Sequence, residues 1–345
     1  ERTTHEIRVA TSQENRWRFI GGAYFDDADL GASIDFTAVG QIENGLTAQQ
    51  APCPGTTMFN PNPRPQGVNF VNDITRFEKQ SAIFGELTYD LVPDTLSATL
   101  GARYYEQEVG LAGSTNFGSF GTTDTDSCLN IDANLAGISP GEETDTIVKF
   151  NVSWTPNDDS LFYATYSEGF RPGGFNRRGG PGSVDPTVFV PFGYVSDTVE
   201  NMEFGWKVSF LDNRLRWNGT AYKVDWSDVQ LTVTDFTISN LTFSTNLGEA
   251  EVTGVDSDVA FSVNDNLTLY ASFAWNDAEM TAVANDIFQP TNIKPAGSSL
   301  AFSPEFQYTL RGRYTWEAGD YDAHVQLALQ HADESENSIV IAQQA

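Results

Sequence analysis

The sequence has few cysteines, few histidines and no long apolar run. Only two of its 345 residues are cysteine and three are histidine, and no histidine stands in a metal-ligand spacing or beside a nucleophile motif. No apolar stretch approaches the ~20 residues of a membrane-spanning helix. These absences exclude a helical membrane protein, and they give no support to a metal site or a resident cofactor.

Basic residues are scarce as well. The chain carries 19 Lys and Arg against 47 Asp and Glu, a formal net charge of -28. A chain this acidic would not bind nucleic acid through a basic patch. The acidity indicates either a solvated surface or one that attracts cationic ligands. The chain also lacks a G-x-S-x-G elbow, a P-loop and a G-x-G-x-x-G loop, so we do not expect an enzyme.

What the sequence does contain is one hairpin pattern, repeated. Residues 87–100 form an alternating stretch, a turn at Pro93 and Asp94, and a second alternating stretch. The same pattern returns around turns at 156–159, 212–213, 264–266 and 318–320. These tight turns all lie at one end of the hairpins, whereas the connections at the other end are long. Short turns on one side and long loops on the other are typical of an outer-membrane β-barrel.

The alternation has a period of two, which places apolar and polar side chains on opposite faces of a strand. Over residues 96–104 the even positions, such as Leu100, are apolar, and Thr99 belongs to the other phase. A soluble sandwich would turn the apolar face inward, whereas a membrane barrel turns it to lipid. Strands at or beyond the ~9–11 residues that cross a bilayer favour the barrel. So do the aromatic residues beside the tight turns, which suit an interfacial girdle: Tyr89, Trp154, Phe210 and Trp316.

The predicted fold is therefore all-β: a partial transmembrane antiparallel β-barrel with short periplasmic turns and long extracellular loops. We expect a single domain over residues 1–345. The predicted strands are 3–12, 15–28, 74–92, 95–109, 144–155, 160–169, 197–211, 214–234, 241–263, 267–281, 301–316 and 321–332. The predicted long loops, rich in Gly, Pro, Asn and Thr, are 29–73, 110–143, 170–196 and 282–300.

Four strings resemble segments of the TonB-dependent outer-membrane receptors. They are YSEGFRPGGFN (166–176), ENMEFGWK with LDNRL (200–207 and 211–215), DWSDVQ (225–230) and NLGEAEVTGVD (246–256). In the last string Asp256 replaces the family's usual Glu. The strings occur in the family's order, and the resemblance covers about residues 3–333. The motif residues are Gly169, Phe170, Arg171, Pro172, Gly173, Gly174, Asn246, Gly248 and Gly254.

The resemblance implies active uptake of a scarce, large nutrient across the outer membrane of a Gram-negative bacterium. It implies about twelve of the 22 strands of such a barrel, without the plug domain, the TonB box or the final strands. The chain begins at Glu1 without methionine and stops inside an apparent strand at 338–342, so we expect a fragment. The implied partners are outer-membrane lipid, TonB through the missing N-terminal region, and a cargo that is most often a ferric siderophore.

The Gly-rich segment 169–180 is the first candidate ligand site, because it lies where a strand ends in a long loop. Arginines there can grip a carboxylate or an anionic ferric chelate by paired hydrogen bonds. The alternative is a structural rim motif in which Arg171 pairs with inward-facing acids. The candidate ligand-binding residues are Arg171, Arg177, Arg178, Phe175, Asn176, Phe192 and Tyr194.

Three further features leave alternatives open. Asp124, Asp126 and Asp132 lie in one loop, but their spacing matches no EF-hand, so a solvated loop is preferred to a cation site. Cys53 and Cys128 fall in expected loops on the same side of the sheet, and their pairing in a disulfide is left open. Aromatic loop residues suit either ligand stacking or loop packing: Phe59, Phe70, Phe117, Phe120, Phe189, Phe192 and Tyr194.

Three other functions compete with active uptake. A passive porin would show the same girdles and the same alternation. A secreted β-rich adhesin or glycan-binding module would be soluble without detergent. A β-sheet hydrolase would need a cleft with paired carboxylates, and the sequence shows no such pair.

Overall fold

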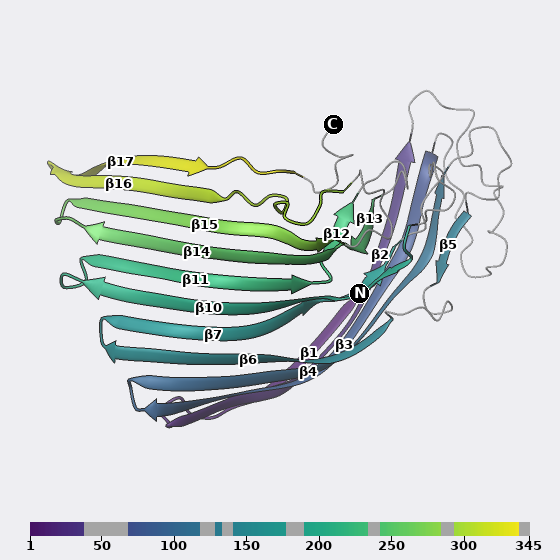
Figure 1. Ribbon diagram of the computed structural model, residues 1–345, viewed down its shortest axis with the longest axis horizontal. Coiled ribbons are helices and arrows are strands. Elements are labelled where there is room, and N and C mark those ends of the chain that lie inside the picture. The colour runs from purple at the N-terminus through teal and green to yellow at the C-terminus, as the bar shows by residue number, and fades with distance from the viewer. Residues whose placement is uncertain are drawn as a thin grey trace.

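The computed structural model describes residues 1–37, 68–117, 128–132, 141–176, 190–233, 242–283 and 293–337. These residues form one large antiparallel sheet and two small two-stranded sheets (Figure 1). The large sheet has the order β1 (Arg2–Ala10), β2 (Trp17–Thr37), β3 (Val68–Val92), β4 (Leu96–Phe117), β6 (Glu142–Asn157), β7 (Ser160–Arg171), β10 (Asp197–Phe210), β11 (Leu215–Ser227), β14 (Gly248–Ser262), β15 (Leu267–Val283), β16 (Phe306–Ala318) and β17 (Tyr321–Ala332).

Three short elements stand beside this order. β5 (Cys128–Asp132) pairs with the C-terminal part of β4, from Ala112 to Asn116. β8 (Gly174–Phe175) pairs with β9 (Gly193–Tyr194), and β12 (Gln230–Val233) pairs with β13 (Phe243–Asn246). None of the described residues forms a helix long and apolar enough to cross a membrane. The fold is all-β, as predicted.

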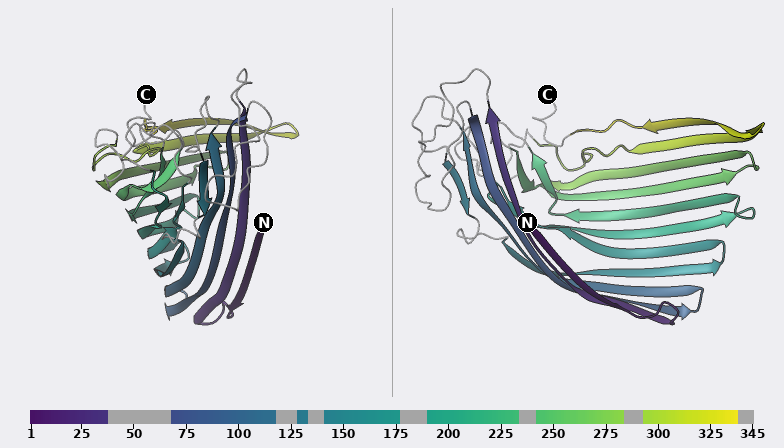
Figure 2. Two further views of the ribbon diagram at one scale, coloured as in Figure 1. Left: turned by 90° about the vertical axis from the view of Figure 1, so that its right-hand side faces the viewer. Right: turned by 180° about the vertical axis from the view of Figure 1, so that it is seen from behind.

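The large sheet is a curved wall, and each strand in it pairs with the strands that come before and after it in the sheet order, which follows the sequence (Figures 1 and 2). Within the described residues it does not close on itself, and β1 and β17 are its two edges. The tight turns lie together at one end of the wall, which we call the short-turn end (Figure 1). The prediction of a partial barrel with its turns on one side is confirmed.

Two predicted loops were too long. Residues 29–37 and 68–73 continue β2 and β3, and 110–117 continue β4, so these strands contain 21, 25 and 22 residues. Their polar and Gly-rich composition suggested loops, yet the backbone ladder runs unbroken from Trp17↔Tyr89 to Ile34↔Asn72. A ladder needs only paired backbone groups, and it tolerates a weakly alternating sequence where neighbouring strands continue with it.

Two predicted strands are each two strands. The expected strand 214–234 ends as β11 at Ser227, turns at Asp228 with a φ of 53°, and resumes as β12 in another sheet. The expected strand 241–263 is likewise divided into β13 and β14 around Leu247. The alternation continues through both breaks, because β12 and β13 alternate too, so periodicity alone could not reveal the change of partner.

The two faces of the wall differ as the alternation predicts. We call the face that carries Leu100 the outward face and the face that carries Thr99 the inward face. Leu100 is 62% exposed, whereas Thr99 is 9% exposed and its hydroxyl lies 2.8 Å from that of Thr88. Inward polar groups pair across strands, as in the 3.3 Å contact of Lys149 with Glu86. Exposed apolar outward residues continue across the whole wall, among them Ile7, Ile83, Phe150, Met202, Phe204, Leu269, Leu310 and Leu327.

Buried apolar clusters lie away from the short turns. One contains Val229, Val233, Phe243, Leu247 and Met280, and a smaller one joins Ile74 and Leu111 to Phe175. The second cluster connects β3 and β4 with β8, which follows β7 in the chain. Because Ile74 and Leu111 belong to the inward phase, the small β8–β9 sheet lies against the inward face of the wall.

The outward face gives a first prediction. Leu310→Arg should lower the free energy of unfolding of the complete gene product in lipid by ~2–4 kcal/mol, because a charge would then face hydrocarbon. Gln307→Arg, in the same strand but in the inward phase, is the matched control and should cost far less. Urea titration of the two folded variants in phospholipid vesicles measures the difference. Equal losses would contradict the assignment of the faces.

Candidate functional site

A cluster of polar side chains joins three chain segments where β7, β10 and β11 leave the short-turn half of the wall. Its centre is the Asp197 carboxylate, whose side chain is only 3% exposed. Arg171 donates to both oxygens of Asp197, at 3.3 and 2.5 Å. The Trp226 indole and the Gln230 backbone N–H donate to Oδ2 at 3.0 and 3.1 Å. We call Arg171, Asp197, Trp226 and Gln230 the rim joint.

The backbone carbonyls around this cluster are also bonded. Arg171 Nη2 donates to the Gln230 carbonyl at 2.7 Å. The Gln230 side-chain amide donates to the carbonyls of Pro172 and Val195, both at 2.9 Å. Arg171 therefore closes a ring of contacts between the end of β7, the start of β10 and the start of β12. The donors around the buried Asp197 carboxylate satisfy both of its oxygens, in keeping with the general rule that buried charges are paired.

Two asparagines bond backbone in the same way on either side of the rim joint. Asn176 Nδ2 donates to the carbonyls of Pro191 and Ser244 at 2.8 and 2.6 Å, and its Oδ1 accepts from the Ser244 N–H at 2.8 Å. Asn246 Nδ2 donates to the carbonyls of Val195 and Asp228 at 3.0 and 2.6 Å. Each side-chain amide thus links two segments that are far apart in the chain.

Three of the predicted aromatic ligand residues, Phe175, Phe192 and Tyr194, pack against other residues of the rim. Phe175 is 2% exposed, lies against Ile74 and Leu111, and its ring centroid is 5.3 Å from that of Phe192. Tyr194 covers Gly174, where a Cβ atom would lie 2.5 Å from the Tyr194 hydroxyl. Phe175, Phe192 and Tyr194 therefore pack the rim, and their rings are not arranged as an open stacking platform.

The other described motif residues also make contacts within the protein. Phe170 stacks on Tyr105 with ring centroids 3.9 Å apart, and the Gly173 N–H donates to Ser196 Oγ at 2.9 Å. Gly248 has a φ of 126°, which only glycine adopts readily, and a Cβ there would lie 2.2 Å from the Ala282 carbonyl oxygen. Gly254 lies under the ring of Tyr222.

Several predicted residues lie outside the described part of the chain. These are Arg177, Arg178, Cys53, Asp124, Asp126, Phe59, Phe120 and Phe189. Others are described only in their backbone: Phe70 pairs with Phe117 in the β3–β4 ladder, and Cys128 and Asp132 are the ends of β5. The disulfide, the acidic loop and the loop aromatics stay predictions. Among the described residues no group of acids, histidines or cysteines is arranged to hold a metal ion.

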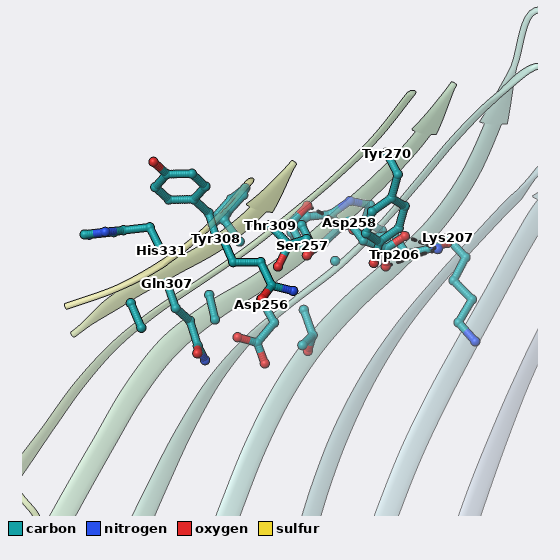
Figure 3. A pocket seen from close by; sticks show the side chains of 18 of the residues that line it. Trp206, Lys207, Asp256, Ser257, Asp258, Tyr270, Gln307, Tyr308, Thr309 and His331 are labelled. Carbon is teal, nitrogen blue, oxygen red and sulfur yellow. Dashed lines mark hydrogen bonds between the residues drawn. The ribbon is translucent and has the colours of Figure 1, made fainter. Parts of the chain in front are cut away.

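A furrow of about 730 Å³ crosses seven strands of the wall from β7 to β17, and side chains of both faces line it (Figure 3). Asn218 donates to the carboxylate of Asp258 at 3.1 Å, and Lys207, Asp256 and Gln307 line the same stretch. Figure 3 shows Asp256 and Gln307 on one side of the ribbon and Tyr308 on the other. This furrow presents charges of both signs to the hollow of the wall, which suits a wet interior.

Comparison with known proteins decides the family. The family model described as "TonB dependent receptor-like, beta-barrel" matches residues 3–340. The chain belongs to the TonB-dependent receptor β-barrel family. This family consists of transport receptors, and the receptor resemblance drawn from the four strings is confirmed.

Solved structures share the fold of this receptor barrel at low sequence identity. The ferric yersiniabactin uptake receptor FyuA from Yersinia pestis matches with a TM-score of 0.64 and 14% identity over 96% of this chain and 42% of its own. The copper transporter OprC matches at 0.60 and 15%, over 99% and 46%. The ferric-catecholate import receptor Fiu from E. coli K12 matches at 0.56 and 13%, over 92% and 42%. The chain thus spans less than half the length of each.

Sequence reasoning missed the acid at the centre of the rim joint. Asp197 is the first residue of a predicted strand and has no motif around it, so nothing marked it as a partner of Arg171. Gln230 ends one of the recognised strings, but its side chain had no predicted role. A search for buried polar partners needs the register of β7 on β10, which pairs Arg171 with Asp197 and is not readable from either strand alone.

The rim joint gives a second prediction. Asp197→Asn removes the charge that holds Arg171 and should destabilise the rim by about 1.5–3 kcal/mol, the usual range for a hydrogen bond to a charged group. Hydrogen exchange of the Gln230 and Ser244 amides measures this loss locally. Asp159→Asn in an exposed tight turn is the control. Unchanged exchange at Gln230 in the Asp197 variant would show that the joint does not hold the loop bases.

Proposed function

We propose that this chain is part of an outer-membrane receptor that takes up a scarce, large nutrient, with energy from the TonB complex. The observation that carries the proposal is the opposite chemistry of the two faces of one curved wall, in a chain of this family. An exposed apolar outward face suits hydrocarbon, and a paired polar inward face suits a water-filled lumen. The location is then the outer membrane, with the short turns in the periplasm.

The cargo that we favour is a ferric chelate. The similar solved structures are an uptake receptor for ferric yersiniabactin, an import receptor for a ferric catecholate and a copper transporter, so a metal or metal chelate is the class of cargo that they share. Such cargo is recognised at the extracellular mouth, where Arg171 leaves its side chain about half exposed. Arg76, in the inward phase of β3, is exposed and lies 3.5 Å from the Phe175 carbonyl oxygen at the same mouth.

Within this proposal the candidate residues divide into two roles. One group makes hydrogen bonds to backbone groups at the ends of the connections, and we assign it the role of positioning those connections: Asp197, Gln230, Asn176 and Asn246. Arg177 and Arg178 follow Asn176 directly, so the position of Asn176 determines where they begin. We assign anion binding to Arg177 and Arg178 and a supporting part to Arg171, whose Nε and Nη2 are already bonded to the rim joint.

Ligand affinity tests the assignment. Replacement of both Arg177 and Arg178 by alanine in the complete gene product should weaken binding of an anionic ferric chelate about 10²–10⁴-fold, since two charged hydrogen bonds worth roughly 1.5–3 kcal/mol each are lost. Arg313→Ala, on the inward face nearer the short turns, is the control. Tryptophan fluorescence titration with a panel of ferric chelates reads the affinity. Equal affinities for both variants would remove these arginines from the site.

Energy dependence separates the active receptor from its competitors. Deletion of the complete gene should reduce growth when one ferric chelate is the sole iron source, and a protonophore should abolish uptake in the wild type. Uptake that persists after collapse of the proton gradient would indicate a passive porin. Recovery of the protein from culture medium without detergent would instead favour a secreted adhesin or glycan-binding module. No chemical step is required in any of these tests.

A further inference from the structure

The outward face has an open apolar groove across its β11 to β17 part. It has a volume of about 550 Å³ and lies on the outward phase of β11, β14, β15, β16 and β17. One cross-strand row runs Leu215↔Phe261↔Leu269↔Gly312↔Leu327. The next row places Ala271 beside Leu310, and Leu310 beside Leu329. We call this feature the Gly312 groove, because its floor lies where the row of large side chains is interrupted by Gly312.

Gly312 differs from other glycines of the wall. Gly205, Gly219 and Gly254 each lie under an aromatic ring of a neighbouring strand, so a Cβ atom at those positions would be 2.2, 2.2 and 2.5 Å from a ring atom. At Gly312 a Cβ would meet only Leu269 Cδ2, at 3.5 Å, among the described residues. That is an ordinary van der Waals distance. The backbone therefore does not require glycine here, and no ring of the wall fills the space.

The walls of the groove are purely aliphatic and aromatic on this face. Leu269, Leu310, Leu327 and Leu329 are 42%, 46%, 76% and 55% exposed. Tyr270 and Arg311 also border it, but they belong to the inward phase, where the Arg311 guanidinium lies 4.9 Å from the Tyr270 ring centroid. A cavity without hydrogen-bonding side chains cannot hold ordered water at low cost. Its occupant has to be a hydrocarbon.

The position of the groove favours a phospholipid. Leu215 is the first residue of β11 and Phe261 is the second-last of β14, so the groove opens toward the short-turn end. Arg214 precedes Leu215 there, and it donates to the carbonyls of Ser262 and Val263. A fixed guanidinium at this end complements a phosphate headgroup. The groove is also continuous with the outward face that the proposed function places in the bilayer.

We propose that the Gly312 groove binds one acyl chain of a phospholipid, whose headgroup lies at the short-turn end near Arg214. The inference rests on the proposed outer-membrane location, and it adds a defined lipid site to the lipid-facing wall. Gly312 is the specificity-determining residue, because any larger side chain there fills the space that the chain would occupy.

Photocrosslinking tests the site in the complete gene product, reconstituted with a phospholipid that carries a diazirine in its acyl chain. Gly312→Leu should reduce labelling of the peptides that contain Leu310 and Leu327 about ten-fold, the effect of excluding roughly two methylene groups. Ala102→Leu, which places the same side chain on the outward phase of β4, is the control and should leave groove labelling unchanged. Labelling of the Leu100 peptide serves as an internal reference for membrane placement.

Three outcomes would overturn the inference. Undiminished labelling at Leu310 and Leu327 in Gly312→Leu would show that only unspecific lipid covers this face. Crosslinks between two copies of the chain at these residues, made with a bifunctional reagent at Leu327→Cys, would make a second copy the occupant. Loss of labelling at both Leu100 and the groove in the wild type would remove the membrane location itself, and with it the proposed function.

Discussion

The structure depends on the pairing of backbone groups between neighbouring strands. In the outer membrane that we propose as its location, the wall would have no water to satisfy a free N–H or C=O, so each strand would have to bond its neighbours along its membrane-crossing length. The register from β1 to β17 meets this requirement with few shifts, and every pairing along the path is antiparallel. Because the ladder is made by backbone groups alone, the side chains on the two faces can differ in polarity. The apolar outward phase and the polar inward phase follow from that division.

The same constraint explains which parts of the fold the sequence predicted. Tight turns and alternating strands are local features, so the hairpins around Pro93, Asp212 and Asp265 were all located correctly. The upper parts of β2, β3 and β4 were not, because away from the apolar band the alternation weakens while the backbone ladder continues. The division of residues 214–234 at Asp228 was also hidden. Both halves alternate, and only the change of partner separates them.

The candidate site was predictable in its location and not in its chemistry. The Gly-rich segment around Arg171 was recognised, and the structure places it at the mouth of the wall. The partner of Arg171 lies 26 residues later in the chain, and the contacts of Asn176 with Ser244 span 68 residues. Such pairs depend on register and on the curvature of the sheet. Arg171, which the motif suggested as a ligand contact, donates hydrogen bonds through Nε and Nη2 to Asp197 and Gln230, so part of its guanidinium already holds the rim.

The use of neutral amides at the rim has a chemical consequence over time. Asn176 and Asn246 each turn an NH₂ group toward two carbonyl oxygens. Spontaneous deamidation would replace that group with a carboxylate oxygen, so attraction to the carbonyls would become repulsion without any change in side-chain size. Deamidation of Asn176 or Asn246 would therefore weaken the contacts at the rim one residue at a time, while the strand pairing of the wall would stay intact.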